Sequence, residues 1–500
     1  MKRIVLLLAA LAVIGIVTSN AQVKTVRGTV TNTINGNPIS GASVVILGGT
    51  NGTVTNEKGE YRLYLPINAT TLVFSFVGMK TKKAAVSGSV VNASLEPASV
   101  DLDEVVVLGY QTKEKSEITG SVVQIDGEQL SNMPVTSFDQ ALQGKIPGLN
   151  ISTTSGTPGA YHDIRIRGVS SINAGNYPLF VIDGVPVINE NFAGHENQSS
   201  LTTLAALNSI DIESITVLKD ASATSVYGAR GANGVIVVTT KKGRVGKTRF
   251  NANVTIGFQN NAVEGLRPLT GAQKAELLNE AVHNTFGINK NETNSFLVNT
   301  LNVTAIKNWN NEEGNWNELL LNKNAPVQTY DVSASGGDAI SSFYASFGYN
   351  NTEATAVGAD FERVTAKLNY NRSLSHSVRF SSNIMVSNIL QKGITEPSLY
   401  FRNPHVTRYL MSPWEQPYFD DGTLNTNVNS SIFNTLYTIK NDILTNNLTR
   451  GLANSYLEWL VIPNFKLKTL FAVDYNIAAY HNYVNRVHGD GVNAGGYTNQ

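Results

Sequence analysis

The sequence predicts a mainly β protein: an N-terminal β-sandwich, a middle α+β domain, and then part of a transmembrane antiparallel β-barrel. Three observations support this prediction. Charged residues make up only 15% of the chain, while Gly, Asn, Ser, Thr and Tyr are abundant, a composition that favours strands and turns. Apolar residues recur with period two through most of the C-terminal half. An apolar leader at the N-terminus indicates export.

The N-terminus has the features of a secretory signal peptide. Lys2 and Arg3 precede an apolar run of about 14 residues, and the small residues Ser19 and Ala21 follow. The run is shorter than the ~20 residues that a helix needs to cross a bilayer. We therefore expect a signal peptide over 1–21 that is cleaved after Ala21, rather than a membrane anchor.

Composition and motifs exclude several classes of function. The 38 basic and 38 acidic residues balance, which gives no argument for a nucleic-acid partner. The chain has no Cys, which excludes disulfides, zinc thiolate sites and thiol nucleophiles. A phosphate-loop-like stretch at 243–248 lacks the required glycine spacing. The seven His are interpreted as loop or surface residues, and the pair Asp211 and Glu213 as solvated or capping. We expect no metal, no cofactor and no catalysis.

The segment 22–97 is predicted to be a small β-sandwich. Short alternating strands are separated by turns such as Asn37–Gly41 and Asn56–Gly59, at roughly ten-residue spacing. Its carboxylates, Glu57 and Glu60, are expected to be turn and surface residues rather than ligands.

A linker is predicted over 98–117. Its β-prone stretch, Leu102–Tyr110, is followed by the charged residues 113–117. The stretch is either an ordinary strand that ends the sandwich or an extended peptide that a partner captures by adding it to a sheet edge. The residues alone leave both interpretations open.

The segment 118–243 is predicted to be an α+β domain. It contains expected strands at 121–125, 163–168 and 179–184, and a short helix at 137–144. It closes with 211–243, in which three glycines recur at every third position before a buried β-branched strand.

The segment 247–500 is predicted to be the N-terminal part of an outer-membrane β-barrel. Long alternating strands are separated by Asn-rich loops, one of which contains a helix at 270–286. The competing interpretation is a soluble β-sandwich in which one face of each sheet is exposed to solvent. Aromatic residues near the strand ends favour the barrel, because such residues form girdles at membrane interfaces.

Specific motifs then identify a family resemblance. The stretches 211–215 and 217–236, the run Ile164–Gly168 and the run Phe180–Pro186 closely match the plug domain of SusC/RagA-type TonB-dependent outer-membrane transporters. The segment 22–97 resembles the transthyretin-like, carboxypeptidase-regulatory-like module. The plug signature in this chain comprises Arg165, Arg167, Gly168, Lys219, Asp220, Tyr227, Gly228, Arg230, Gly231 and Gly234.

The resemblance implies a function and a set of partners. It implies import of a large nutrient, an oligosaccharide or a peptide, across the Gram-negative outer membrane, with a SusD-like lipoprotein and outer-membrane lipid as partners. The energy would come from the proton-motive force through TonB with ExbB and ExbD. The sandwich and the TonB box would lie in the periplasm. By resemblance, the TonB box comprises Asp103, Glu104, Val105, Val106, Val107, Leu108 and Gly109.

Ligand contacts are expected on loops of the plug. Aromatic side chains suit sugar faces, and the candidates are Tyr161, Tyr177, Phe192 and His195. Alternative functions are a siderophore or cobalamin receptor of the wider TonB-dependent class, and a cell-surface adhesin without transport.

The strand count departs from the family pattern. Only roughly seven to ten strand candidates follow Lys247, at ~10 residues per crossing, whereas outer-membrane transporters of this kind have about 22 strands. We therefore expect the sequence to be a fragment. The alternatives are a smaller barrel and a truncated product.

Overall fold

The computed structural model describes residues 23–499 except for 34–35, 49–50, 67–68, 77–78, 97–104, 109–110, 115–120, 132, 134, 154, 174, 190, 192–199, 264, 302–310, 395–402, 429–431 and 464. The predicted signal peptide lies outside the described residues. The chain divides into two compact units, 1–105 with 114–116, and 106–113 with 117–500.

The first unit is a β-sandwich of two sheets. One sheet has the order β4-β1-β7 and the other the order β3-β2-β5-β6. The strands are β1 (Val23–Asn32), β2 (Ser43–Ile46), β3 (Gly52–Val54), β4 (Glu60–Pro66), β5 (Thr71–Ser75), β6 (Lys82–Ala85) and β7 (Ala93–Leu95).

The sandwich core follows from strand periodicity. In β4 every second residue is buried, which places Tyr61, Leu63 and Leu65 inside. The Tyr61 ring packs edge-on against Phe74 at 5.6 Å, and its hydroxyl donates to the Val91 carbonyl at 2.7 Å. Burial raises the pKa of Tyr61 to about 12. The polar end of this core aromatic is therefore hydrogen-bonded, as a buried hydroxyl requires.

The second unit begins with the plug, whose main sheet has five strands in the order β10-β15-β16-β13-β14. All pairs are antiparallel except β13 with β16, and a separate hairpin pairs β11 with β12. The strands are β10 (Val122–Asp126), β11 (Leu149–Thr153), β12 (His162–Ile166), β13 (Leu179–Ile182), β14 (Val185–Val187), β15 (Ile212–Leu218) and β16 (Val235–Thr240).

Short helices connect the plug strands. They are α2 (Glu128–Ser131), α3 (Phe138–Ala141), η2 (Thr203–Ala206), η3 (Ser209–Asp211), α4 (Ala221–Thr224) and η4 (Ser225–Gly231). The helix predicted at 137–144 is shorter than expected. It ends at Ala141, and turns lead to Gly144, whose φ of +74° lies outside the helical region.

The signature glycines serve turns and close contacts inside the plug. Gly228 and Gly234 adopt φ values of +62° and +89°, which L side chains rarely adopt. A Cβ on Gly231 would lie 2.8 Å from the Thr224 carbonyl oxygen, also within the plug. Within 211–243, Gly243 meets the barrel strands, since a Cβ there would lie 2.3 Å from the Phe343 nitrogen.

Replacing Gly231 with Val is expected to lower the amount of correctly folded protein. The new side chain would press on the backbone of α4, and overpacking of this kind costs about 1–3 kcal/mol. Gly156→Val is the matched control, because a Cβ there meets no atom within 4 Å. Heat-modifiable mobility of the membrane-extracted protein measures the effect. Normal assembly of Gly231→Val with weaker ligand binding would contradict this explanation.

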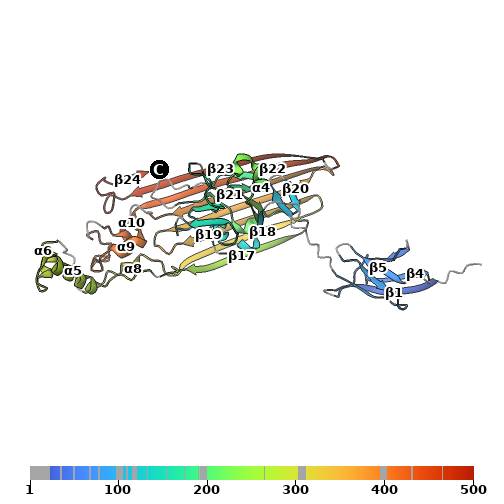
Figure 1. Cartoon of the computed structure of the whole chain (residues 1–500), viewed down its shortest axis with the longest axis horizontal. Helices are drawn as coiled ribbons and strands as arrows, with labels where there is room; N and C mark the ends of the chain where they lie inside the picture. The colour runs from blue at the N-terminus through green and yellow to red at the C-terminus, as the bar shows by residue number, and fades with distance from the viewer. Residues whose placement is uncertain are drawn as a thin grey trace, which may run out of the picture. The chain divides into compact units, whose positions relative to one another are not determined.

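The barrel portion is one antiparallel sheet of eight strands in chain order, β17 to β24. Its long strands run side by side in Figure 1. They are β17 (Gly246–Gln259), β18 (Ala325–Gly337), β19 (Ser341–Glu353), β20 (Asp360–Ser373), β21 (Val378–Lys392), β22 (Ile443–Ile462), β23 (Phe465–Val484) and β24 (Tyr497–Asn499).

The two ends of this sheet differ. At one end the strands are joined by turns of a few residues, such as Asp338–Ile340. At the other end long loops contain α5 (Gly271–Phe286), α6 (Thr293–Asn299), α8 (Trp316–Leu319), α9 (Pro404–Leu410) and α10 (Thr435–Asn441), as Figure 1 shows. The predicted helix is confirmed as α5, which begins at a Thr270–Gln273 capping box. Among the described residues, no helix combines the length and apolar character needed to cross a membrane.

The polarity of the barrel strands is inverted relative to a soluble sheet. On β20, Arg363, Thr365, Lys367 and Asn369 are each at most 4% exposed, while Leu368 is 47% exposed. On β17 the apolar residues Phe250, Val254, Ile256 and Phe258 are likewise exposed. An apolar outer face and a polar inner face are what a membrane barrel requires. The mainly β fold, with a sandwich, a plug and a barrel sheet, is therefore confirmed.

Candidate functional site at the plug–barrel interface

Cationic side chains of the barrel wall hold the plug by its backbone. The Arg363 guanidinium donates through Nη1 to the carbonyl oxygens of Thr136 and Ala205, both at 2.8 Å. Four residues further along the same strand, Lys367 Nζ donates to the Lys241 carbonyl at 3.2 Å. Both side chains are only 4% exposed. Because the acceptors are main-chain atoms, these bonds depend on the path of the plug chain rather than on its side chains.

A buried ion pair makes a third attachment. Arg450 on β22 pairs with Asp474 on β23 through two bonds, Nη2 to Oδ2 at 2.8 Å and Nε to Oδ1 at 3.0 Å. Its Nη1 donates to the Thr203 carbonyl of the plug at 3.0 Å. The Arg450 side chain is fully buried. This bidentate geometry satisfies both partners away from solvent.

Two carboxylates of the plug accept hydrogen bonds from side chains of the barrel wall. Asp211 Oδ1 accepts from the Tyr344 hydroxyl at 2.8 Å and from Ser346 Oγ at 2.6 Å. Asp183 Oδ2 accepts from Asn383 Nδ2 at 2.6 Å. Asp211 is 1% exposed, so our expectation that it lies on a solvated or capping segment was wrong. The local sequence pattern could not show that the barrel strands would cover Asp211.

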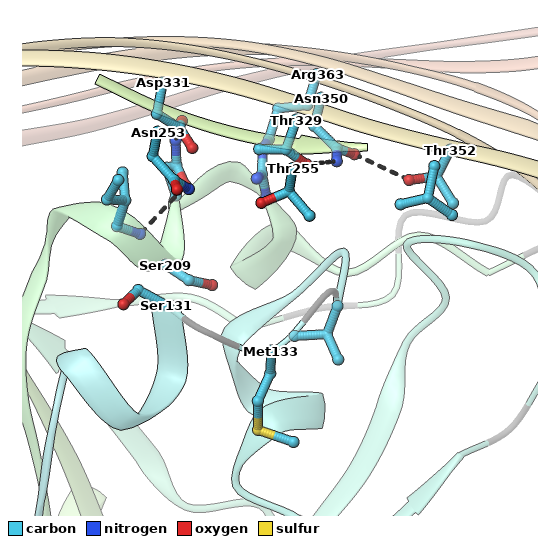
Figure 2. Close-up of a pocket in the computed structure, with 14 residues that line it drawn as sticks. Ser131, Met133, Ser209, Asn253, Thr255, Thr329, Asp331, Asn350, Thr352 and Arg363 are labelled. Atoms are coloured by element: carbon cyan, nitrogen blue, oxygen red, sulfur yellow. Dashed lines mark hydrogen bonds between the residues drawn. The ribbon is translucent and has the colours of Figure 1, made fainter. Parts of the chain in front are cut away.

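A polar cavity of about 150 Å³ lies between plug and barrel (Figure 2). Figure 2 shows barrel side chains from β17 to β20 facing Ser131, Met133 and Ser209 of the plug. Asn208 Nδ2 donates to Asp331 Oδ1 at 2.6 Å, and Asn350 Nδ2 to Thr329 Oγ1 at 2.7 Å. The cavity has room for a few ordered waters but not for a nutrient.

Several buried polar atoms of the barrel wall have no protein partner within the described ranges. Ser381 Oγ and Ser387 Oγ on β21 are two of them. Because buried polar groups are nearly always hydrogen-bonded, we expect ordered water at these positions. The interface therefore combines exchangeable polar contacts with apolar clusters, such as the one that Phe361, Ile389 and Leu448 form with Leu201 and Ala205.

The predicted ligand residues are only partly brought together. Tyr161 and Tyr177 meet edge-to-face, with ring centroids 6.0 Å apart. Tyr161 is 8% exposed and Tyr177 is 46% exposed, so only the second presents much surface. Burial, followed by the neighbouring Tyr177, raises the pKa of Tyr161 above its ordinary value. Phe192 and His195 lie outside the described residues, and a ligand role for all four stays a prediction.

The predicted TonB box is described in part. Val105–Leu108 forms β8, which pairs with β9 (Gln111–Glu114) in a two-stranded sheet. Asp103, Glu104 and Gly109 lie outside the described residues. The segment therefore adopts the extended conformation that strand addition to a partner needs, and the box itself stays a prediction.

The charged signature residues stabilise the plug's own turns. Arg167 pairs with Asp220 at 2.6 Å, and Lys219 Nζ donates to the Pro147 carbonyl at 3.0 Å. The Ser121 amide, and then Arg167, hold the pKa of Asp220 below its usual value. Arg165 pairs with Asp163 at 2.6 Å. These contacts are internal to the plug and give the signature a structural role.

Sequence reasoning also misjudged His162. It is 4% exposed, and its Nδ1 lies 2.7 Å from Asp139 Oδ2. The same carboxylate is in contact with the Ser137 hydroxyl. The helix start at Ser137 and the strand start at His162 are far apart in sequence, so only the tertiary fold joins them. Within the described ranges no cluster of three or more metal-binding side chains occurs.

Comparisons with known proteins agree with this architecture. The TonB-dependent Receptor Plug Domain family matches residues 114–235, and the CarboxypepD_reg-like domain family matches residues 26–107. The TonB-dependent receptor SusC of Bacteroides thetaiotaomicron is 34% identical over 70% of this chain and 32% of its own length. The TonB-dependent receptor P26 of Formosa agariphila is 35% identical over 75% of this chain and 35% of its own length.

The solved structures agree as well. The RagAB peptide importer in its open-open state is 28% identical, with a TM-score of 0.65 over 76% of this chain and 43% of that one. The chain thus spans about a third of the length of the curated relatives it matches.

Proposed function

Because this chain belongs to the SusC/RagA-type TonB-dependent receptors, we propose that it is part of an outer-membrane transporter that imports a large nutrient, a glycan fragment or a peptide. The observation that carries this proposal is a plug held inside an inverted-polarity barrel sheet by hydrogen bonds to its backbone. The solved relatives are described as a peptide importer, which supports a peptide as one candidate nutrient. The relatives are receptors, and we propose no catalytic activity.

The polar interface suits a plug that must move. A hydrogen bond from a charged group contributes about 1.5–3 kcal/mol net, since water can replace the partner. A pull on the plug chain could therefore exchange the contacts of Arg363 and Lys367 for water, one after another. The buried Arg450–Asp474 pair lies on two barrel strands and would stay together as the Thr203 carbonyl leaves.

The asymmetry of the barrel ends supports an orientation. Outer-membrane barrels have short periplasmic turns and long extracellular loops. We propose that the end bearing α5, α8 and α9 faces outward, where a SusD-like lipoprotein would sit over it. The sandwich and the segment Asp103–Gly109 would then lie in the periplasm, where TonB adds the segment to its sheet. ExbB and ExbD would supply the coupling to the proton-motive force.

Dissipating the proton-motive force is expected to stop uptake while surface binding persists. Cells that carry the full-length protein and its lipoprotein are given fluorescent oligosaccharides or peptides, with and without a protonophore. Internal label should fall to the level of cells lacking TonB, because displacement of the plug needs external work. A porin-permeant small sugar is the control for general damage. Uptake that continues unchanged without TonB would refute transport by this route.

A further inference from the structure

The loops at the outward end enclose a second and larger cavity. It measures about 650 Å³ and lies between residues 260–261 and 265–270, the residues around α8, and α9 with the residues after it. This volume is within the range of about 300–1,000 Å³ that is usual for small-molecule sites. The cavity is thus large enough for a few sugar or peptide residues, unlike the water-sized space at the plug.

The segments that line the cavity are joined by an apolar cluster and by hydrogen bonds. Trp316 and Met411 are buried in one apolar cluster with Leu320 and Val428. The Trp316 indole donates to the Glu415 carbonyl at 2.8 Å, which joins α8 to the segment after α9. The loop before α5 is tied to the same region, because the Gly271 amide donates to Glu313 Oε1 at 2.8 Å. These cross-links hold the walls in place without a ligand.

Arg408 lines this cavity with no ion pair to any described carboxylate, although its guanidinium lies 4.4 Å from the centre of the Tyr409 ring. The residue is 6% exposed, and its Nη2 donates to the Tyr409 hydroxyl. Its Nε and Nη1 have no hydrogen-bond partner in the part of the chain that the structure describes. A buried guanidinium without a carboxylate is costly. Burial and the charge of Arg408 also hold the pKa of the neighbouring His405 below its usual value.

The acidic residues around the cavity are already occupied. Glu318 Oε1 pairs with Lys323 at 2.9 Å, and Glu313 accepts from the Gly271 amide. Asn317, which also lines the cavity, has a buried Oδ1 without a hydrogen-bond partner among the described residues. The cavity wall thus holds a buried, unpartnered cationic donor and a buried, unpartnered neutral acceptor. A molecule with a carboxylate and a nearby hydroxyl or amide N–H would satisfy both.

We propose that this cavity is a binding subsite for a carboxylate-bearing nutrient, with Arg408 as the residue that recognises the anion. The inference rests on the proposed transport function and narrows its substrate class. The carboxylate could belong to a uronic acid or to an acidic peptide. Both present the same planar group to a guanidinium fork, and the Asn317 oxygen would accept from a sugar hydroxyl or a peptide N–H.

Matched anionic and neutral probes test this subsite on the full-length receptor in detergent. The probes are oligogalacturonates with their methyl esters, and a glutamate-rich peptide with its glutamine counterpart. Calorimetric titration of the wild type should show tighter binding of one anionic probe than of its neutral match. Arg408→Gln should weaken that binding by about 10-fold or more, since a hydrogen bond to a charged group is lost. It should leave the neutral match nearly unchanged, and the pair that responds identifies the source of the carboxylate.

Two further variants keep the test decisive. Lys440→Gln removes an exposed cation from α10, outside the cavity, and should change no affinity by more than about 2-fold, because exposed charges contribute little. Arg408→Lys retains the positive charge but loses the paired N–H donors of the guanidinium. If Arg408 recognises the anion, this variant should bind the anionic probe more tightly than Arg408→Gln and less tightly than the wild type.

Several results would overturn the inference. One is no measurable binding of either anionic probe to the wild type. Another is equal weakening of anionic and neutral probes by Arg408→Gln. A third is loss of the lipoprotein from the complex in Arg408→Gln with probe affinities unchanged, which would assign Arg408 to the partner. TonB-dependent uptake of neutral probes under any of these results would leave the transport proposal standing.

Discussion

Deleting Leu102–Gly109 from the full-length receptor is expected to abolish uptake and to leave ligand binding at the cell surface intact. The deletion removes β8, the short extended segment that we propose as the strand TonB captures. Without this segment TonB cannot exert force on the plug, while the outward loops that bind ligand remain folded. Uptake and surface binding of the same labelled probe are measured on the same cells.

A point variant makes this prediction sharper. Val106→Pro removes a main-chain N–H donor and should block strand addition, whereas Val106→Thr keeps both the donor and β propensity. We therefore expect Val106→Pro to resemble the deletion and Val106→Thr to resemble the wild type. Unchanged uptake in the deletion would exclude this segment as the TonB box. Loss of surface binding as well would indicate a folding defect.

Replacing Arg450 with Ala is expected to destabilise the full-length receptor by about 3–5 kcal/mol. Removing one partner of a buried pair leaves the other charge uncompensated, here Asp474, whose side chain is 13% exposed. The Thr203 carbonyl of the plug also loses its donor. Thermal unfolding in detergent measures the stability, and limited proteolysis of the plug reports its seating.

Two companion variants separate charge from packing. Arg450→Met with Asp474→Leu removes both charges and should recover most of the stability, because no buried charge is left unpaired. Lys466→Ala breaks an exposed pair with Glu458 in the same two strands, 3.2 Å apart, and should cost less than about 1 kcal/mol. An Arg450→Ala protein as stable as Lys466→Ala would show that water solvates this part of the interface.

Much of the fold could be read from local pattern. Period-two alternation predicted long strands in the C-terminal half, and the helix expected at 270–286 is α5. The plug motif was recognisable because its turns need particular residues. Gly168 and Gly184 adopt φ values of +98° and +85°, which a side chain would hinder.

The candidate site could not be predicted in the same way. Alternation shows that Arg363 and Leu368 face opposite sides of β20. It does not show which side the plug covers and which side stays exposed. Only the plug seated against the polar face decides that Arg363 is buried and Leu368 exposed. The same applies to Asp211, whose local sequence suggests a solvated side chain. In the structure it is covered by Tyr344 and Ser346, which lie more than a hundred residues further along the chain.

The sequence by itself determined the order of domains, the strand pattern and the plug signature, because each depends on residues close together in the chain. The tertiary structure decided which polar side chains join plug to barrel, where Gly243 touches the wall, and that Arg408 lines a cavity in which no described carboxylate pairs with it. The physical reason is that burial and pairing of charges depend on contacts between distant segments. Local propensity and periodicity carry no information about those contacts.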